Sequence, residues 1–364
     1  MARNSAHPKL FIPGPTEVAP EILAAMAMPA IGHRTPECAR LWQAAREGLG
    51  RLMHQSGEIC ILTAPASALM EAAIRNTVHQ RSLHLVCGAF SRRWFQIAQA
   101  CGKDAVAVET DWGKGFDAEQ LRKALHANGP FDAVTVVHNE TSTGVMNPVQ
   151  DYAAVVADFP GTLLLVDTVS SMAGAPVLVD DWGIDVCLFG VQKCMAMPAG
   201  ISIASVSANA LERAAQIEHR GWFLDFLLLQ QGNLKEQSPT TPSTAHLYAL
   251  NLQLERIFAE GLEARWQRHA DMAQRTREWA EGHGFELFPA PEFCSPTVSC
   301  IARGKGPDFG PALIELKDHG YLVSNGYGDL KGKTFRIGHM GEHDLASLND
   351  LLVHFDAALH ATVQ

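Results

Sequence analysis

Short apolar segments alternate with helical patterns through the first two thirds of the chain, and this alternation constrains the fold more than any other feature. We predict buried strands at Ile59–Leu62, Leu83–Cys87, Ala133–Val137, Leu163–Val166, Ile184–Phe189 and Ile201–Val206. Helical patterns such as Asp117–Ala127 and Val149–Ala157 lie between them. A strand, a crossover helix and a second strand form a parallel pair, and helices cover both faces of sheets built from such pairs. The sequence therefore predicts an α/β fold with a mostly parallel sheet, whose ligands collect at the carboxyl ends of the strands.

The pattern changes near Gln237–Pro242, where prolines interrupt it. Two long helical patterns follow, at Ser243–Ala259 and Leu262–Gly282, and shorter strand and helix patterns alternate after them. A chain of 364 residues suits two unequal domains or one large α/β unit. We predict an N-terminal arm at residues 1–16, a large domain at residues 17–259 and a smaller C-terminal α/β domain at residues 260–364.

The composition argues against several classes of protein. The formal net charge is −10, whereas a nucleic-acid binder needs a basic face. No apolar run approaches the roughly 18 residues that a membrane span needs, and the first residues lack the apolar core of a signal peptide. The eight cysteines include no CxxC pair, so we expect buried thiols in a reducing cytoplasm. The sixteen histidines include no pair at metal-ligand spacing, so no metal site is expected.

Asp167 directly follows one predicted strand, and Lys193 comes 26 positions later, after the next predicted strand. An acid and a lysine in these places are what a pyridoxal phosphate enzyme needs. The lysine forms an imine with the cofactor aldehyde and later moves protons, and the aspartate keeps the pyridine nitrogen protonated. Taken singly, Lys193 would be read as a surface lysine and Asp167 as a helix cap.

Two other segments place polar groups after strands. His138–Gly144 carries an amide and several hydroxyls, although turn formation explains them equally well. At Thr63–Glu71 a strand gives way to small residues and then a helix, so backbone N–H groups at the helix N-terminus could bind a phosphate monoester. An ordinary capped helix explains this second segment as well.

Together these segments resemble the class V (fold type I) aminotransferases, in the branch of the alanine–glyoxylate, serine–pyruvate and phosphoserine aminotransferases. The matching segments extend over nearly the whole chain: Phe11–Thr16, Gly32–Glu37, Met70–Ala73, His138–Pro148, Val166–Ser171, Gly183–Asp185, Gln192–Lys193 and Phe335–Gly341. The resemblance implies a large domain built on a mostly parallel sheet of the seven-stranded type, a smaller C-terminal α/β domain, and pyridoxal 5'-phosphate as cofactor.

The resemblance also implies roles for single residues at the cofactor ring. Lys193 corresponds to the Schiff-base lysine, and Asp167 to the partner of the pyridine nitrogen. Phe90 falls where the family stacks an aromatic side chain on the ring. Thr141 would approach the ring hydroxyl.

At the phosphate end, the resemblance implies that Ala66, Ser67 and Gln192 hold the cofactor phosphate. Gln237 and Thr240 match the segment with which the family reaches across a dimer interface to the neighbour's phosphate, so a homodimer is expected. The family often has Ser-Gly-Thr or Ser-Gly-His where this chain has Pro65-Ala66-Ser67, and Pro65 has no N–H to donate.

At the substrate end, Arg336 matches the arginine that clamps the α-carboxylate, and Gly14 would close the same end of the pocket. His33 and Arg34 match a pair that can meet a substrate phosphate, although a structural role at a helix start explains them about as well. Phosphoserine with 2-oxoglutarate is therefore the favoured pair, with Lys331, Lys333 and Arg220 as possible further cations. Serine, alanine or aspartate with glyoxylate or pyruvate is the alternative.

Three other readings are weighed against an aminotransferase. A cysteine desulfurase usually has histidine before the lysine and a mobile cysteine, whereas Gln192 precedes Lys193 here, and Cys294 and Cys300 are more simply structural. A catalytically silent binding protein would not need lysine, aspartate and arginine together. A nicotinamide-dependent dehydrogenase would carry GxGxxG between its first strand and helix, and this chain does not.

Overall fold

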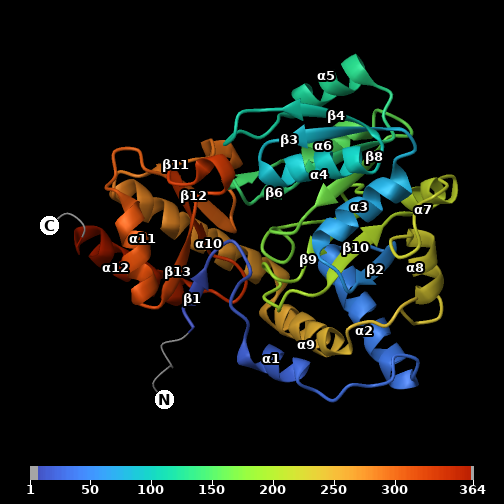
Figure 1. Cartoon of the computed structure of the whole chain (residues 1–364), viewed down its shortest axis with the longest axis horizontal. Coiled ribbons are helices and arrows are strands. Elements are labelled where there is room, and N and C mark those ends of the chain that lie inside the picture. The colour runs from blue at the N-terminus through green and yellow to red at the C-terminus, as the bar shows by residue number, and fades with distance from the viewer. Residues whose placement is uncertain (1–6, 362–364) are drawn as a thin grey trace.

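Two β-sheets form the centres of two lobes in the computed structural model, which describes residues 7–361. Figure 1 shows the larger lobe beside the C-terminal lobe, which is coloured orange to red. The larger lobe contains a seven-stranded sheet and the smaller one a five-stranded sheet.

The seven-stranded sheet is mostly parallel, as the sequence predicts. In spatial order its strands are β2 (Glu58–Leu62), β10 (Ser202–Val206), β9 (Val186–Gly190), β8 (Leu163–Asp167), β5 (Ala133–Val137), β3 (Arg81–Val86) and β4 (Asp104–Glu109). Only β10 runs against its two neighbours, β2 and β9. The edge strand β4 was not predicted: its apolar run, Ala105–Val108, is short and only half-buried, and alanine, which makes up half of this run, has a low preference for strands.

Helices cover both faces of this sheet, and strand residues alternate between the two cores. In β5, Val134 and Val136 belong to one core, whereas Ala133 and Val137 belong to the other. The first core is completed by α1 (Pro20–Met26), α2 (Pro36–Met53), α5 (Ala118–Asn128), α6 (Val149–Val156) and α9 (Thr244–Glu260). The second is completed by α3 (Ala66–Thr77), α4 (Ala89–Ala100), α7 (Ala208–Ala215) and α8 (Phe226–Asn233). Both faces of the sheet are therefore shielded from water, which leaves the ends of the strands to bind ligands.

The smaller sheet combines the two ends of the described chain. Its strands, in spatial order, are β1 (Lys9–Phe11), β13 (Tyr321–Asn325), β14 (Thr334–Gly338), β12 (Val298–Ala302) and β11 (Glu286–Leu287). Helices α10 (Leu262–Gly282), α11 (Phe309–Asp318) and α12 (Leu345–Ala361) complete this lobe around a third, aromatic-rich core. Since β1 pairs in parallel with β13, we propose that the described part of the arm, residues 7–16, is attached to the small domain, with the large domain ending near residue 260.

Candidate active site

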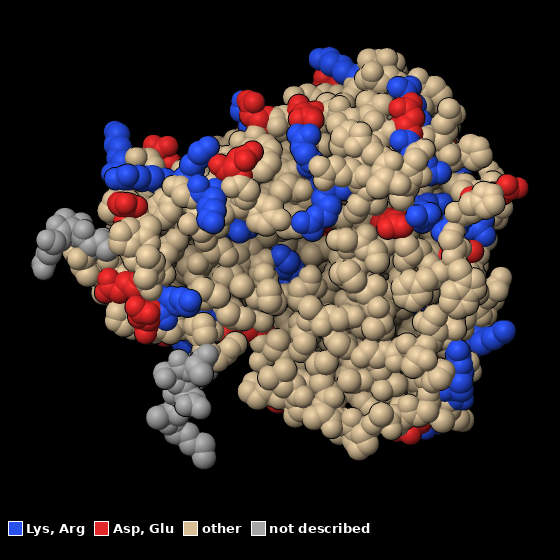
Figure 2. All heavy atoms as spheres, viewed as in Figure 1, with Lys and Arg blue, Asp and Glu red and all other residues tan. Residues whose placement is uncertain are grey.

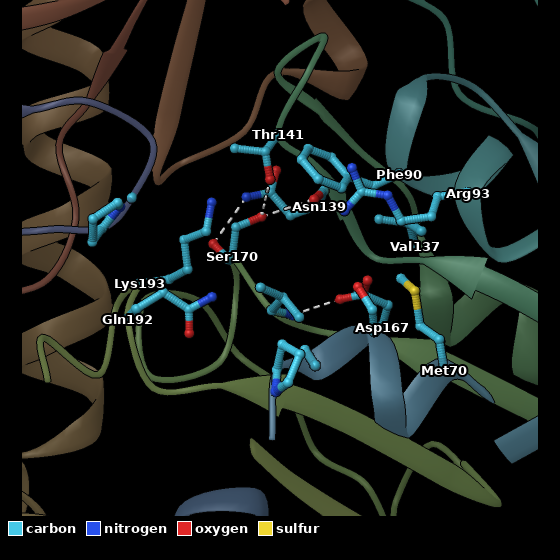
Figure 3. A pocket seen from close by; sticks show the side chains of 16 residues that line it. Met70, Phe90, Arg93, Val137, Asn139, Thr141, Asp167, Ser170, Gln192 and Lys193 are labelled. Atoms are coloured by element: carbon cyan, nitrogen blue, oxygen red, sulfur yellow. Dashed lines mark hydrogen bonds between the residues drawn. The ribbon is translucent and has the colours of Figure 1, made fainter. Parts of the chain in front are cut away.

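The carboxyl ends of β5, β8 and β9 open onto a cavity of about 290 Å³ (Figure 3). This volume is close to the lower end of the range for small-molecule sites, roughly 300–1,000 Å³. The lining residues are Gly14, Pro15, Pro65, Ala66, Ser67, Met70, Phe90, Arg93, Val137, Asn139, Thr141, Asp167, Val169, Ser170, Gln192 and Lys193. The predicted residues at the ring and at the phosphate end, apart from Gln237 and Thr240, thus lie around one cavity.

Lys193 lies in the turn after β9, and its side chain is only 9% exposed. Its amine donates a hydrogen bond to the carbonyl of Pro13. Gly14 leaves space for the lysine stem: a Cβ there would lie 2.3 Å from Lys193 Cδ, and the φ of +90° also favours glycine. Burial, followed by the charge of Arg336, lowers the pKa of Lys193 to about 8. A fraction of the amine is therefore unprotonated near neutral pH and can act as a nucleophile or base.

Asp167 is the last residue of β8 and is 3% exposed. Its Oδ1 accepts a hydrogen bond from Val169 N at 2.7 Å, and none of the described residues donates to Oδ2. Burial is the main cause that raises the pKa of Asp167 to about 7. A cation at this carboxylate would favour its charged form, so the protonated nitrogen of a pyridine ring fits the site.

A hydrogen-bonded cluster forms the side of the cavity next to Asp167. Thr141 Oγ1 lies 2.8 Å from Ser170 Oγ, and Ser170 Oγ donates to Asn139 O at 2.8 Å. Asn139 Nδ2 donates to Ser170 O and to Thr297 Oγ1, which leaves Asn139 Oδ1 buried without a partner among the described residues. A buried acceptor of this kind normally binds a ligand or water, so it fits a polar substituent of the cofactor ring.

At the other end of the cavity, Pro65, Ala66 and Ser67 form the start of α3. The first N–H groups of a helix have no partner within the helix and attract anions. No side chain caps this helix, and among the described residues no hydrogen bond occupies the side chains of Ser67 or Gln192. These groups fit a phosphate, with Pro65 contributing no donor.

Arg336 lies on β14, is 8% exposed, and stands beside the cavity without lining it. Its Nη1 donates to Thr141 O at 3.1 Å, and its Nε and Nη2 donate to Asn325 O. None of the described carboxylates forms an ion pair with it. A buried guanidinium that lacks an anion is suited to a substrate carboxylate.

The remaining predicted residues form a separate group away from the cavity. Arg34 Nη1 donates to Gln237 Oε1 at 3.0 Å and to Ser238 O at 2.6 Å, and its Nη2 donates to Pro239 O at 3.3 Å. The next residue, Thr240, and the partly exposed His33 do not line the cavity either. The three further cations that the sequence suggests for a substrate phosphate do not line the cavity either. Lys331 and Lys333 are exposed, and Arg220 pairs with Asp225.

Sequence reasoning missed Arg93 as a lining residue. Its guanidinium lies 4.9 Å from the centre of the Phe90 ring, and its Nη2 is 3.3 Å from the hydroxyl of Tyr327. Arg92, one position earlier, points instead to the exposed Glu109. Only the phase of α4 distinguishes the two arginines, because Arg93 is one turn after Phe90 and shares its face.

A lysine and a carboxylate at strand ends, an aromatic ring, an anion-binding helix end and a buried arginine together define a fold type I pyridoxal phosphate enzyme. Among residues 7–361 no cluster of histidine, cysteine and acidic side chains could hold a metal ion. None of the helices in that range is long and apolar enough to cross a membrane.

Comparison with known proteins gives the family. The model of the class-V aminotransferases matches residues 24–299, and the chain belongs to this family. It is 34% identical to an L-aspartate–glyoxylate aminotransferase of Paracoccus denitrificans, over 91% of this chain and 86% of the relative. It is 33% identical to a serine–glyoxylate aminotransferase of Methylorubrum extorquens, over 95% of this chain and 89% of the relative.

A solved structure agrees with these sequence comparisons. The alanine–glyoxylate aminotransferase of Nostoc sp. superposes with a TM-score of 0.91 at 31% identity, covering 99% of this chain and 97% of that one. The predicted class, fold and cofactor are thereby confirmed: the protein is a pyridoxal phosphate-dependent aminotransferase whose substrates are an amino acid and a 2-oxo acid.

Proposed function

We propose that this aminotransferase moves the amino group of a small amino acid, such as serine, alanine or aspartate, to glyoxylate. The observation that carries the proposal is that Lys193 and Asp167 line one cavity of about 290 Å³ and that the anion-free Arg336 lies beside it. All three relatives compared above are named for glyoxylate, which supports this acceptor.

Each residue has a task that follows from its chemistry. Bound pyridoxal phosphate supplies an aldehyde for the amino group and a ring that withdraws electrons. Lys193 Nζ, with a pKa of about 8, takes up and returns the substrate's α-proton. Asp167 holds the ring nitrogen in its charged form, Phe90 contacts the ring face, and the start of α3 with Ser67 and Gln192 holds the phosphate.

Arg336 binds the α-carboxylate through two parallel N–H···O bonds, since its planar fork matches a carboxylate. Gly14 lies against the Lys193 side chain. Because both carboxylate oxygens are held in this way, only the side chain distinguishes one amino donor from another. The proposal therefore assigns donor preference to the walls of the cavity and not to Arg336.

Phosphoserine with 2-oxoglutarate, the pair favoured from the sequence, remains a prediction with less support. Its recognition depends on Arg34, whose guanidinium is already engaged by three acceptors of its own chain. Releasing these bonds to bind a phosphate would cost part of what the new contacts supply.

We further propose a cytoplasmic homodimer. All eight cysteines are free, which suits a reducing compartment. Figure 2 shows few charged side chains over α1 and α9. Large apolar side chains are exposed at Leu23, Met28, Trp222 and Phe223, with Trp222 being 64% exposed. A second copy in contact with these side chains would bury them. Trp222 and Phe223 line one pocket with Thr240, so a contact there would bring the loop around Thr240 toward the neighbour's phosphate.

The test is a panel of steady-state reactions of the purified holoenzyme with serine, alanine, aspartate and phosphoserine as donors. Glyoxylate, pyruvate and 2-oxoglutarate serve as acceptors. We expect a small donor with glyoxylate to give the highest kcat/KM, and Lys193→Ala to lose about 10³-fold or more in rate. If phosphoserine reacts faster than alanine, and Arg34→Ala selectively loses activity with phosphoserine, the result would instead support the phosphoserine pair.

A further inference from the structure

Glu140 is a buried carboxylate beside the site to which the proposed function gives no role. It lies in the short strand β6 (Asn139–Glu140), and its two chain neighbours, Asn139 and Thr141, both line the cavity. Its exposed fraction is 0%, and it forms no ion pair with any described lysine, arginine or histidine. Burying a carboxylate without a cation is costly, so its hydrogen bonds must replace water almost completely.

The first turn of α4 and the nearby Ser142 supply these hydrogen bonds. Phe90 N donates to Glu140 Oε2 at 3.1 Å, and Ser91 N donates to the same oxygen at 2.9 Å. The Ser142 hydroxyl donates to Glu140 Oε1 at 2.6 Å and accepts from Ala89 N at 3.0 Å. Because the first turn carries the positive end of the helix dipole, the helix end takes the place of a cation.

Gly88, the N-cap of α4, makes this contact possible. A Cβ on Gly88 would lie 2.4 Å from Glu140 Cγ and 2.6 Å from its Cδ. Its φ of 173° is extended backbone that any residue adopts, so glycine is needed here for space alone. An N-cap residue usually supplies the acceptor itself, whereas here the carboxylate reaches in from a different segment of the chain.

The carboxylate therefore joins two walls of the cavity. On one side it holds the backbone of Phe90, whose ring lines the cavity, and on the other it is followed directly by Thr141 (Figure 3). We propose that Glu140 is a positioning residue, which fixes the first turn of α4 to β6 and so holds the Phe90 ring against the bound cofactor. This inference rests on the role proposed for Phe90.

The charge of Glu140 also acts on the site. After burial, it is among the causes that raise the pKa of Asp167, and it raises the pKa of Lys193 against the larger effect of burial. Replacing Glu140 by a neutral residue should therefore lower both pKa values. These two pKa values report the charge of Glu140, whereas its effect on the position of the Phe90 ring needs a separate measurement.

The experiment compares Glu140→Gln and Gly88→Ala with wild type, all loaded with pyridoxal phosphate. Glu109→Gln is the matched control, because Glu109 also contacts α4, through Arg92, but is exposed. Three quantities are measured: the cofactor dissociation constant, the circular dichroism of the cofactor absorption band, and the pH dependence of that band. None of them requires the amino donor to be known, so a failed substrate panel leaves this test intact.

We expect both variants to weaken cofactor binding about tenfold, which corresponds to one charge-assisted hydrogen bond. The circular dichroism band should shrink in both, and the pH midpoint should move down only in Glu140→Gln, while the control matches wild type. If Glu140→Gln does not fold, Ser142→Ala removes one bond of the same group and should give a smaller loss of the same kind. A lower melting temperature with unchanged dichroism and pH midpoint would reduce Glu140 to a helix cap and overturn the proposal.

Discussion

At the scale of single residues, Asp167 gives the most direct test of the site's electrostatics. Its folded pKa of about 7 lies above the unfolded value of about 3.9. The folded state therefore binds more protons between these values, and the contribution of Asp167 to the free energy of unfolding falls as pH rises from about 4 to about 7. We expect Asp167→Asn to remove this fall in the cofactor-free protein.

Urea denaturation of the cofactor-free wild type and Asp167→Asn at several pH values measures this difference. The two free energies of unfolding should diverge across that window, the variant becoming relatively more stable as pH rises. Parallel curves would mean that the carboxylate is solvated or paired in solution. Asp111→Asn, at an exposed position, is the control and should follow wild type.

At the scale of elements, α10 holds the loops that follow β8 and β9. Arg265 on this helix is 1% exposed, and its guanidinium donates to Cys194 O at 2.8 Å and to Ala173 O at 3.2 Å. It also pairs with Glu260 at 2.7 Å. Cys194 directly follows Lys193, and Ala173 has a φ of +67°, which a residue with a Cβ adopts only under constraint.

Arg265→Met should therefore destabilise the protein by about 3 kcal/mol or more, because two buried carbonyls lose their donor and Glu260 loses a partner. Thermal unfolding and cofactor affinity should both decline. Arg275→Met, on the same helix but half-buried and bonded only to the exposed Asn349, should change stability by less than about 0.5 kcal/mol. Equal melting temperatures for the two variants would contradict this role of Arg265.

The elements also show what the sequence can predict. Local apolar runs indicate buried strands, and the residues at the carboxyl ends of neighbouring parallel strands lie at one edge of the sheet. The sequence therefore predicts that Asp167, Thr141 and Lys193 lie together. The half-buried β4 gives a weaker signal, because half of its apolar run Ala105–Val108 is alanine. The contact of Arg34 with Pro239 spans 205 positions, and no local pattern contains a contact of that range. Glu140 lies in His138–Gly144, a segment that the sequence singles out, but its contact with α4 can be known only from the fold.

At the scale of the whole molecule, a shared site predicts complementation between two inactive chains. Lys193→Ala lacks the lysine, and Thr240→Asp would repel the neighbour's phosphate. In a mixed dimer one site combines the intact Lys193 of one chain with the intact Thr240 of the other. Random mixing after reversible dissociation should thus restore about a quarter of the wild-type sites. Activity that stays at the sum of the two parents, or a fully active monomer in sedimentation, would rule out the shared site.

The pairing of β1 with β13 has a consequence for the order in which the protein matures. Phe11 pairs with Val323, so a segment that is translated before the large domain waits for a partner that is translated after it. Pro13 and Gly14, which contact the Lys193 side chain, follow directly after β1. A nascent chain can form most of the large sheet first, but the wall over its lysine is anchored only when β13 and β14 have been made. Competence for chemistry is thereby delayed until the smaller sheet can form.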